Sequence, residues 1–419
     1  MSNLSIFSAQ NRDACVAAEP DFLSESVDKY YNERGETWQE GSHIMRGSEP
    51  EPGAVMMVSN DYLDLANHSA IRQAQIDALN ATDNTMVMSA VYLHGNSPQE
   101  DFEKRMADWM AMESTLVCQS GYAANVGLIQ AIGGADKPVY IDMMAHASLW
   151  QGIQAAGLQA KPFRHNSSSH LASLIKRNGP GIVVIDSVYS TNGSVAPVAE
   201  IVDVAHQAGC VMIVDESHSL GTHGWQGSGI VAGLGLQDKV HFVTASLAKA
   251  FAGRAGLIAC SRRLAEFIKY HSFPAIFSSA LLPPDIAALD KTLDLIKSAD
   301  EQRQRLFENT TYLRDHLAAL GYNVDISKAQ IIALEAGPEH HTIVLRDALE
   351  ANGVFGSVFC APATAANRSL IRLSINAGLT RRELDHVIKV CRDIRDEVDL
   401  ANWPSTLRAQ RQVTESMAA

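Results

Sequence analysis

The chain has 419 residues, of which 46% are hydrophobic and 19% are charged. That balance is typical of a globular protein and excludes disordered, collagenous and coiled-coil chains. The 47 acidic and 34 basic residues give a formal charge of −13. Because the sequence also has no basic block, nucleic acid and anionic membranes are excluded as its main partners.

Cysteine usage and the first residues indicate an intracellular protein. The six cysteines, at positions 15, 118, 210, 260, 360 and 391, form no C-x-x-C pair. This spacing fits free thiols in a reducing compartment better than a disulfide framework or a zinc site, so we expect no bound metal. The opening MSNLSIFSAQNRDACV lacks the features of a signal peptide, and no apolar run is long enough to span a membrane. We therefore expect a cytoplasmic protein.

Residues 1–58 are mostly polar and predict an N-terminal arm with a helix near residues 21–35. Short apolar runs then alternate with helical patterns, which predicts an α/β fold with a mostly parallel sheet and helices on both faces. The clearest runs are 139–142, 181–186, 211–216 and 241–246. Ligands gather beyond the carboxyl ends of such strands, where we expect Asp142, Asp186, Asp215 and Ser246.

The pattern changes after the proline pair of LLPP (281–284), which suggests a domain junction. A long helical stretch (285–321) leads into a second α+β region that ends in SLIRLSIN (369–376) and another helix. We expect a large domain over 59–285, a smaller one over 286–400 and a tail over 401–419.

The segment VMIVDESHSLGTHG carries the strongest site signal, because an apolar strand delivers Asp215 to the sheet edge and His218 follows closely. A lone aspartate there is also a common helix cap or loop anchor. Two polar groups followed by glycines favour a functional role. A carboxylate aimed at a pyridine nitrogen would keep that nitrogen protonated, as pyridoxal phosphate (PLP) chemistry requires.

A second segment, HFVTASLAKAFAGRAG, places Lys249 just past a strand among small and apolar residues. An isolated lysine is usually a solvated surface charge. Here its neighbours would desolvate the amine, lower its pKa and make it available as a Schiff-base nucleophile. Ser246 could supply a hydroxyl to a phosphate.

Two further segments give weaker signals. Ser120 and Gly121 precede a helical run, whose N-terminus could bind an anion, although an ordinary turn and cap look the same. His146 lies just beyond a strand and could stack on a flat cofactor or simply be a structural histidine.

Arg372 lies on a predicted strand between isoleucine and leucine, so its buried guanidinium needs an anion. A substrate carboxylate and an internal Asp or Glu are equally good candidates. The apolar stretch VFGSVF (354–359) could shape a substrate pocket or form a core strand.

Other motifs are weak or missing. The segment GSGIVA (227–232) matches the dinucleotide fingerprint G-x-G-x-x-A but follows no clear strand, so a nicotinamide-dependent oxidoreductase stays only as an alternative of another class. No G-x-S-x-G serine-hydrolase elbow and no phosphate-binding P-loop occur.

Together these segments resemble the α-oxoamine synthase family, a fold-type I group of PLP-dependent transferases that condense an amino acid with an acyl-CoA. The resemblance runs from SNDYLDLANH (59–68) to the helix after Arg372. It implies a homodimer with active sites at the subunit interface.

The resemblance also implies residue roles. The catalytic set would be Lys249 as the Schiff-base lysine, Asp215 at the pyridine nitrogen, His146 on the ring and His218 beside the phenolic oxygen. The further cofactor contacts would be Ser120, Gly121, Tyr122, Ser190 and Ser246, with Ser278 and Ser279 reaching the phosphate of the neighbouring subunit. The amino-acid substrate would meet Asn60, Tyr62 and Arg372, of which the arginine holds its carboxylate.

Departures from the family pattern point to a subgroup. The chain has S-L-A-K at 246–249, D-E-S-H-S at 215–219, and Gln99 where common members have a histidine. Four segments are similar to the bacterial α-hydroxyketone autoinducer synthases: YLHGNSPQEDFEKRMADW, DSVYST, FPAIFSSALLPP and NGVFGSVFCAPAT.

That subgroup makes quorum-sensing signal precursors from a medium-chain acyl-CoA and a small amino acid or S-adenosylmethionine. The implied reaction releases coenzyme A and is decarboxylative in some members, with Lys249 removing the Cα proton. A housekeeping enzyme of the same family, such as an 8-amino-7-oxononanoate synthase or an aminoketone-CoA ligase, is the alternative.

Overall fold

The computed structural model describes residues 19–33, 44–81, 87–93, 97–134 and 136–409. The chain divides into two compact units, Met1–Ser48 and Glu49–Ala419. In the first unit, α1 (Asp21–Glu33) confirms the predicted helix, and its described side chains are mostly exposed. Cys15 and the end of the predicted tail lie outside the described residues.

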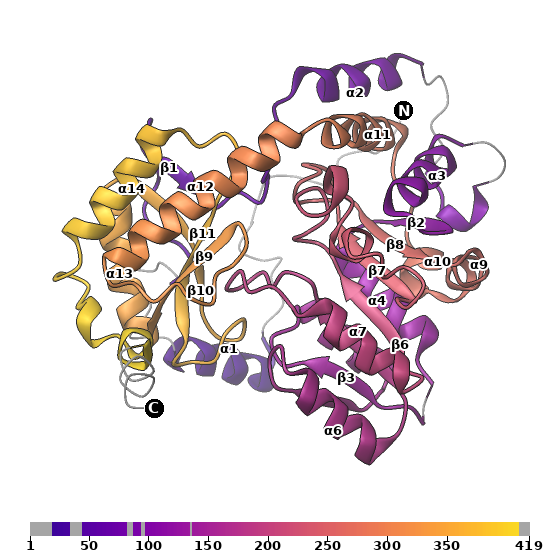
Figure 1. The fold of residues 1–419 in the computed structure, drawn as a ribbon, viewed down its shortest axis with the longest axis horizontal. Helices are drawn as coiled ribbons and strands as arrows, with labels where there is room; N and C mark the ends of the chain where they lie inside the picture. The colour runs from indigo at the N-terminus through magenta and orange to yellow at the C-terminus, as the bar shows by residue number, and fades with distance from the viewer. Residues whose placement is uncertain (1–18, 34–43, 82–86, 94–96, 135, 410–419) are drawn as a thin grey trace, which may run out of the picture. The chain divides into compact units, whose positions relative to one another are not determined.

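A large sheet of seven strands organises the second unit (Figure 1). In spatial order its strands are β2 (Ser114–Cys118), β8 (Gly256–Cys260), β7 (Phe242–Ser246), β6 (Val211–Asp215), β5 (Ile182–Asp186), β3 (Val139–Asp142) and β4 (Ala160–Phe163). Strand β8 is antiparallel to both neighbours, and the other adjacent pairs are parallel. The predicted mostly parallel sheet is thus confirmed.

Both faces of this sheet are buried. Along β5, Ile182 and Val184 belong to one buried apolar cluster, and Val183 and Ile185 belong to the other. Such alternation is expected when successive β-branched side chains point to opposite, equally covered faces. The first face is covered by α4 (Gly121–Ile132) and α5 (Ala147–Ala155), and the second by α6 (Ser168–Asn178) and α7 (Val198–Gln207).

The second unit also contains a smaller, mixed sheet of four strands. Its order is β1 (Val55–Met57), β10 (Val354–Phe359), β11 (Ser369–Ser374) and β9 (Ile331–Gly337). Strand β1 pairs in parallel with β10, while the other two pairs are antiparallel. The segment VFGSVF is therefore a strand of this sheet, and part of the predicted N-terminal arm, β1, joins it as well.

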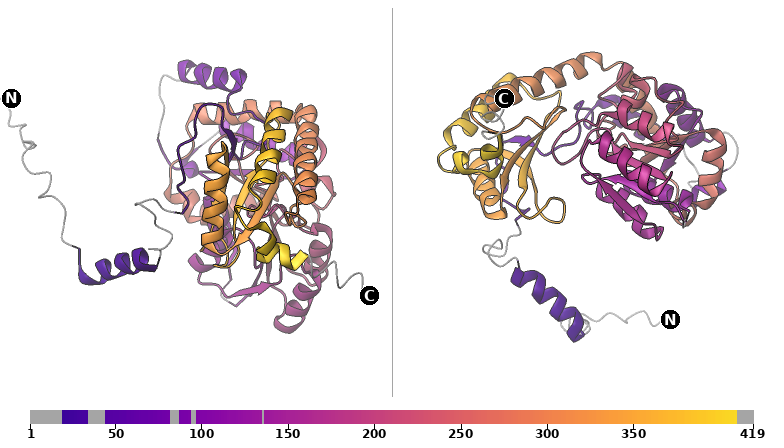
Figure 2. Two further views of the ribbon diagram at one scale, coloured as in Figure 1. Left: turned by 90° about the vertical axis from the view of Figure 1, so that its left-hand side faces the viewer. Right: turned by 60° about the horizontal axis from the view of Figure 1, so that its bottom comes forward.

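The remaining helices pack around the two sheets. Figures 1 and 2 show α12 (Asp300–Ala319) beside α14 (Arg381–Asp393), against which it packs, and α13 (Glu339–Ala351) packs on the smaller sheet. Helix α11 (Pro283–Lys297) packs against α2 (Ser69–Ala81) and α3 (Pro98–Met110). Other helices of the described ranges are α8 (Ile230–Gly233), α9 (Arg262–His271), α10 (Phe273–Phe277), η2 (Ala90–Tyr92), η3 (Trp225–Gly227) and η4 (Leu400–Asn402).

The long helical stretch expected over 285–321 is in fact two helices. Ser298 ends α11 by donating its hydroxyl to the carbonyl oxygens of Asp294 and Leu295, at 3.1 and 3.0 Å. A serine side chain that bonds the last carbonyls competes with continued helix. Asp300 then starts α12, where its negative charge suits the helix N-terminus.

None of the helices in the described ranges combines the length and hydropathy that a bilayer crossing needs.

Candidate active site

The polar strand ends predicted from the sequence meet at one edge of the large sheet. Asp186 at the end of β5 is the register partner of Asp215 at the end of β6, and Asp215 is the partner of Thr244 on β7. Asp142 ends β3 and Ser246 ends β7.

Asp215 is buried and held on both oxygens. Its Oδ1 accepts a hydrogen bond from the backbone N–H of Ser217 at 2.8 Å, and its Oδ2 accepts one from Asn125 Nδ2 at 2.6 Å. Asn125 lies in the apolar helix α4 and was not predicted as a site residue. Its signal in the sequence is a buried amide on a helix face that is otherwise apolar, which needs a polar partner.

His146 is the N-cap of α5, four residues after the end of β3. Its backbone N–H donates to Asp186 Oδ2 at 3.0 Å, and its Nδ1 lies 2.8 Å from Ser148 Oγ. Burial lowers the pKa of His146; Asp215 opposes this effect and Lys249 adds to it. The ring is therefore neutral at physiological pH, which suits stacking on a flat cofactor.

Lys249 lies in the loop after β7, as predicted. Burial lowers the pKa of its amine, the charge of Arg372 lowers it further, and Asp215 opposes both. No carboxylate of the described residues forms an ion pair with it. A larger neutral fraction of the amine makes Lys249 a better nucleophile and base.

The start of α4 forms a place for an anion next to the end of β7. Ser120 caps this helix by accepting from Ala123 N–H at 3.0 Å, while no acceptor for the N–H groups of Gly121 and Tyr122 lies among the described residues. A Cβ on Gly121 would lie only 2.6 Å from Ser246 Cβ, so the two segments approach as closely as glycine allows. The Tyr122 side chain is 49% exposed.

Arg372 lies on β11 and is 5% exposed. Its Nη1 donates to the carbonyl of Ser190 and its Nη2 to Asn60 Oδ1, both at 3.0 Å, and its Nε has no partner among the described residues. Within the described ranges no Asp or Glu pairs with it. Burial lowers the pKa of this guanidinium, although the nearby Tyr62 opposes the effect. A buried cation without a carboxylate favours the substrate-anion interpretation over an internal acid.

Tyr62 and His218 form a buried pair. The Tyr62 hydroxyl lies 2.6 Å from His218 Nδ1. Burial lowers the pKa of His218 well below its usual value, and the charges of Lys249 and Arg372 lower it further.

Ser278 and Ser279 lie at the end of α10, and neither is tied to the groups above. Ser278 Oγ donates to the carbonyl of Pro274, and the Ser279 carbonyl accepts from Gln119 Nε2 at 2.8 Å. Their contact with a neighbouring subunit's cofactor stays a prediction, since it concerns a second chain.

The residues present fit PLP. Two helix N–H groups without acceptors suit a phosphate, and Asp215, fixed by two hydrogen bonds, suits a pyridinium nitrogen. A desolvated lysine follows the adjacent strand end.

The structure does not support GSGIVA as a dinucleotide-binding motif, and so gives no support to a nicotinamide-dependent oxidoreductase. GSGIVA spans η3 and the four-residue helix α8, and a Cβ on Gly229 would lie 1.9 Å from Glu216 Oε2. This glycine therefore makes room for a buried carboxylate that accepts from Val231 N–H at 2.8 Å. A dinucleotide fingerprint would instead join a strand directly to a long helix.

A Ser–His–Asp trio elsewhere has the contacts of a serine-hydrolase triad. His165 joins Asp142 Oδ1 through Nδ1 and Ser194 Oγ through Nε2, both at 2.9 Å. Ser194 is buried, and its hydroxyl donates to Asn192 Oδ1 at 2.8 Å. A nucleophile must face a substrate, so we interpret this trio as structural.

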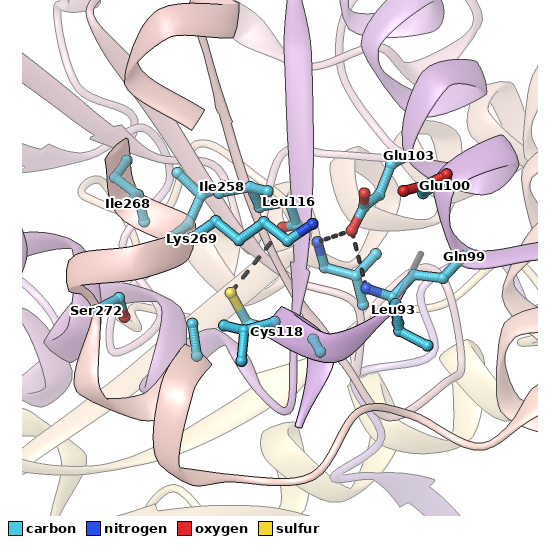
Figure 3. A pocket seen from close by; sticks show the side chains of 14 residues that line it. Leu93, Gln99, Glu100, Glu103, Leu116, Cys118, Ile258, Ile268, Lys269 and Ser272 are labelled. Carbon is cyan, nitrogen blue, oxygen red and sulfur yellow. Dashed lines mark hydrogen bonds between the residues drawn. The ribbon is translucent and has the colours of Figure 1, made fainter. Parts of the chain in front are cut away.

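Figure 3 shows a pocket beside β2 that none of the predicted site residues lines. Glu103 Oε1 accepts from Gln99 Nε2 at 3.0 Å and from Val117 N–H at 2.8 Å. Burial raises the pKa of Glu103 to about 7, while these two hydrogen bonds and the charge of Lys269 act in the opposite direction. Glu103 thus joins α3 to the edge strand β2. Gln99, which stands where the family has a histidine, helps to hold the Glu103 carboxyl in place.

The lysine after β7 and the two-sheet architecture define a fold-type I α/β transferase. The family described as aminotransferase class I and II matches residues 53–390, and the chain belongs to it.

Within that family the chain is an α-oxoamine synthase, as the resemblance implied. CAI-1 autoinducer synthase from Vibrio campbellii is 47% identical over 91% of this chain and 97% of that protein. The 8-amino-7-oxononanoate synthase of Alkaliphilus metalliredigens is 29% identical over 83% and 89%. Serine palmitoyltransferase from S. paucimobilis, solved with a bound PLP–myriocin compound, shares the fold with a TM-score of 0.83, 24% identity and coverage of 90% and 99%.

Proposed function

We propose that this protein is a PLP-dependent acyl-CoA:amino acid C-acyltransferase that makes an α-aminoketone or α-hydroxyketone precursor of a quorum-sensing signal. Its substrates are a medium-chain acyl-CoA and a small amino acid or S-adenosylmethionine. The observation that carries this proposal is the 47% identity to a CAI-1 autoinducer synthase over nearly the whole of both chains.

The cofactor belongs at the edge of the large sheet. Bound PLP supplies an electron sink for the negative charge that develops at the Cα of the amino acid. The N-terminus of α4 and Ser246 would hold its phosphate, Asp215 would interact with its ring nitrogen, and His146 would cover its ring. Ser190 lies beside this site through its carbonyl contact with Arg372.

Two side chains act on the substrate, Arg372 as the cation that holds it and Lys249 as the base that deprotonates it. Arg372, fixed by Asn60 and the Ser190 carbonyl, binds the amino-acid carboxylate in a bidentate manner. Lys249 Nζ, whose pKa is lowered by burial, takes the Cα proton in its neutral form and later returns a proton to the product. The new carbon–carbon bond forms between this Cα and the acyl carbonyl carbon, and the thiolate of coenzyme A leaves. Loss of the original carboxylate as carbon dioxide then gives the α-aminoketone.

The proposal includes a homodimer in the cytoplasm. Ser278 and Ser279, which form no hydrogen bond with the proposed cofactor groups among the described residues of their own chain, would then contribute to the neighbouring site.

Product analysis tests the function. The PLP-loaded protein is incubated with short-, medium- and long-chain acyl-CoAs together with amino acids and S-adenosylmethionine, and products are identified by mass spectrometry. We expect medium-chain α-aminoketones or their immediate derivatives, released together with coenzyme A. With alanine and a seven-carbon ω-carboxyacyl-CoA added to the panel, formation of 8-amino-7-oxononanoate would instead support the housekeeping alternative.

Lys249→Ala serves as the negative control, because it removes the proposed base without altering the sheet. Turnover by this variant would contradict the assignment of Lys249.

A further inference from the structure

Tyr62 was expected to contact the substrate, but its surroundings point to a different role. The side chain has no exposed surface, and His218, its partner, is 5% exposed. The hydroxyl lies 2.6 Å from His218 Nδ1, so this bond is well formed and shielded from water.

The direction of this hydrogen bond follows from the two groups. Burial raises the pKa of Tyr62 well above its usual range and lowers the pKa of His218 well below its own. A neutral phenol and a neutral imidazole therefore meet. A neutral imidazole carries one ring hydrogen, so if that hydrogen is on Nε2, the phenol must donate the hydrogen bond to Nδ1.

The alternative acceptor for the phenolic proton is weaker. Asn60 Oδ1 lies 3.5 Å from the Tyr62 hydroxyl and already accepts from Arg372 Nη2 at 3.0 Å. The short contact to Nδ1 is therefore the one that takes the proton. Among the described residues, no hydrogen-bond partner is found for His218 Nε2.

We propose that Tyr62 is a positioning residue that donates its proton to His218 Nδ1 and so keeps a hydrogen on Nε2, the nitrogen left free for a bound ligand. The ligand atom that receives this hydrogen is an oxygen acceptor, of the kind that a phenolate or a carbonyl group presents. Gln330 fixes the same histidine from its backbone, donating to the His218 carbonyl at 2.6 Å.

Ring-nitrogen NMR of the PLP-loaded protein with ¹⁵N-labelled histidine tests this directly, because protonated and unprotonated ring nitrogens resonate far apart. His218 is assigned by comparison with His218→Gln. We expect its Nδ1 to be unprotonated and its Nε2 protonated. A hydrogen on Nδ1 in the parent protein would overturn the proposal without any Tyr62 variant.

Tyr62→Phe removes only the hydroxyl. We expect the fixed tautomer of His218 to be lost, the pH midpoint of the bound-PLP absorbance to move, and kcat to fall about tenfold with little change in the KM for acyl-CoA. Tyr322→Phe is the matched control, since it removes another buried phenolic hydrogen bond, to the Cys391 carbonyl at 2.8 Å. It should leave all three readouts unchanged.

A double-variant cycle separates positioning from general packing. If Tyr62 acts through His218, Tyr62→Phe adds nothing in the His218→Gln background, whereas an additive loss would contradict the proposal. The inference rests on the proposed PLP chemistry, yet the two can fail separately. Absence of PLP binding would remove the proposed function, while bound PLP with an unchanged His218 tautomer in Tyr62→Phe would remove only this role.

Discussion

Asn125 connects two residues that the sequence analysis treated as independent. Its Nδ2 donates to Asp215 Oδ2 and, at 2.9 Å, to Ser148 Oγ, which in turn contacts His146 Nδ1. The ring-facing histidine and the carboxylate are thus oriented by one amide. In a buried network, the loss of one member leaves the others without partners.

Replacing that amide should weaken cofactor binding. In Asn125→Ala, Asp215 Oδ2 loses its 2.6 Å donor and Ser148 loses another. We expect the Kd for PLP, followed by absorbance, to rise on the order of tenfold, since an unsatisfied buried group costs about 1–3 kcal/mol. Asn178→Ala is the control, because that exposed amide bonds only the Leu174 carbonyl; an equal effect there would refute the network.

Arg372 should discriminate between the two substrates. Arg372→Ala removes the buried guanidinium proposed to bind the amino-acid carboxylate, so the KM for the amino acid should rise roughly 30-fold, equivalent to about 2 kcal/mol. The KM for acyl-CoA should change little. Arg368→Ala is the matched control, because that exposed arginine already pairs with Glu335 at 2.8 Å. Equal changes in both KM values for Arg372→Ala would contradict the carboxylate assignment.

At the scale of elements, the residues at strand ends could be predicted from the sequence, whereas contacts between residues far apart in the chain could not. Asp215 and Ser246 follow from apolar runs with polar ends, and Arg372 follows from a charged residue inside an apolar run; both patterns are confined to a few residues. The pairing of the three-residue strand β1 with β10 depends on contacts between residues far apart in the chain, such as Val55 with Val354. Asn125 was missed for a similar reason, since only packing of α4 on the sheet brings it to Asp215.

The contact between α4 and β7 gives a prediction at this scale. Gly121→Ala places a methyl group 2.6 Å from Ser246 Cβ and 2.8 Å from its Cα, so one element must shift. We expect overpacking of about 1–3 kcal/mol and weaker PLP binding, because the shift separates the helix N-terminus from Ser246. Gly134→Ala, whose Cβ would meet only Lys137 at 4.0 Å, is the control for the urea and PLP titrations. Unchanged PLP affinity in Gly121→Ala would place the phosphate elsewhere.

For the whole molecule, the net charge of −13 contrasts with the buried cation Arg372 at the site. Lys249 and Arg372 are close enough that the arginine lowers the pKa of the lysine, and no carboxylate neutralises either through an ion pair in the described part of the chain. An acidic surface favours solubility, while local positive charge attracts anionic substrates. The overall charge therefore says little about affinity for acyl-CoA.

Buried carboxyls make the stability of the whole molecule depend on pH. Burial raises the pKa of Glu103 and of Glu216 to about 7, from a reference value of 4.5. Between these values the folded chain keeps a proton that the unfolded chain releases. The contribution of each group to the free energy of unfolding therefore falls as pH rises from about 4.5 to 7 and is then constant. His223, whose pKa burial lowers to about 4, acts in the opposite direction below pH 6.5.

Comparison of a variant with its parent isolates one carboxyl from these opposing effects. Glutamine at position 103 can still accept from Gln99 and from Val117 N–H, but it cannot ionise. Relative to the parent, Glu103→Gln should therefore gain stability as pH rises, by on the order of 2 kcal/mol between pH 5 and pH 8. Urea unfolding of the PLP-loaded proteins at several pH values measures this gain. Exposed Glu266→Gln should show no such trend, and a flat difference for Glu103→Gln would mean that Glu103 is ionised throughout.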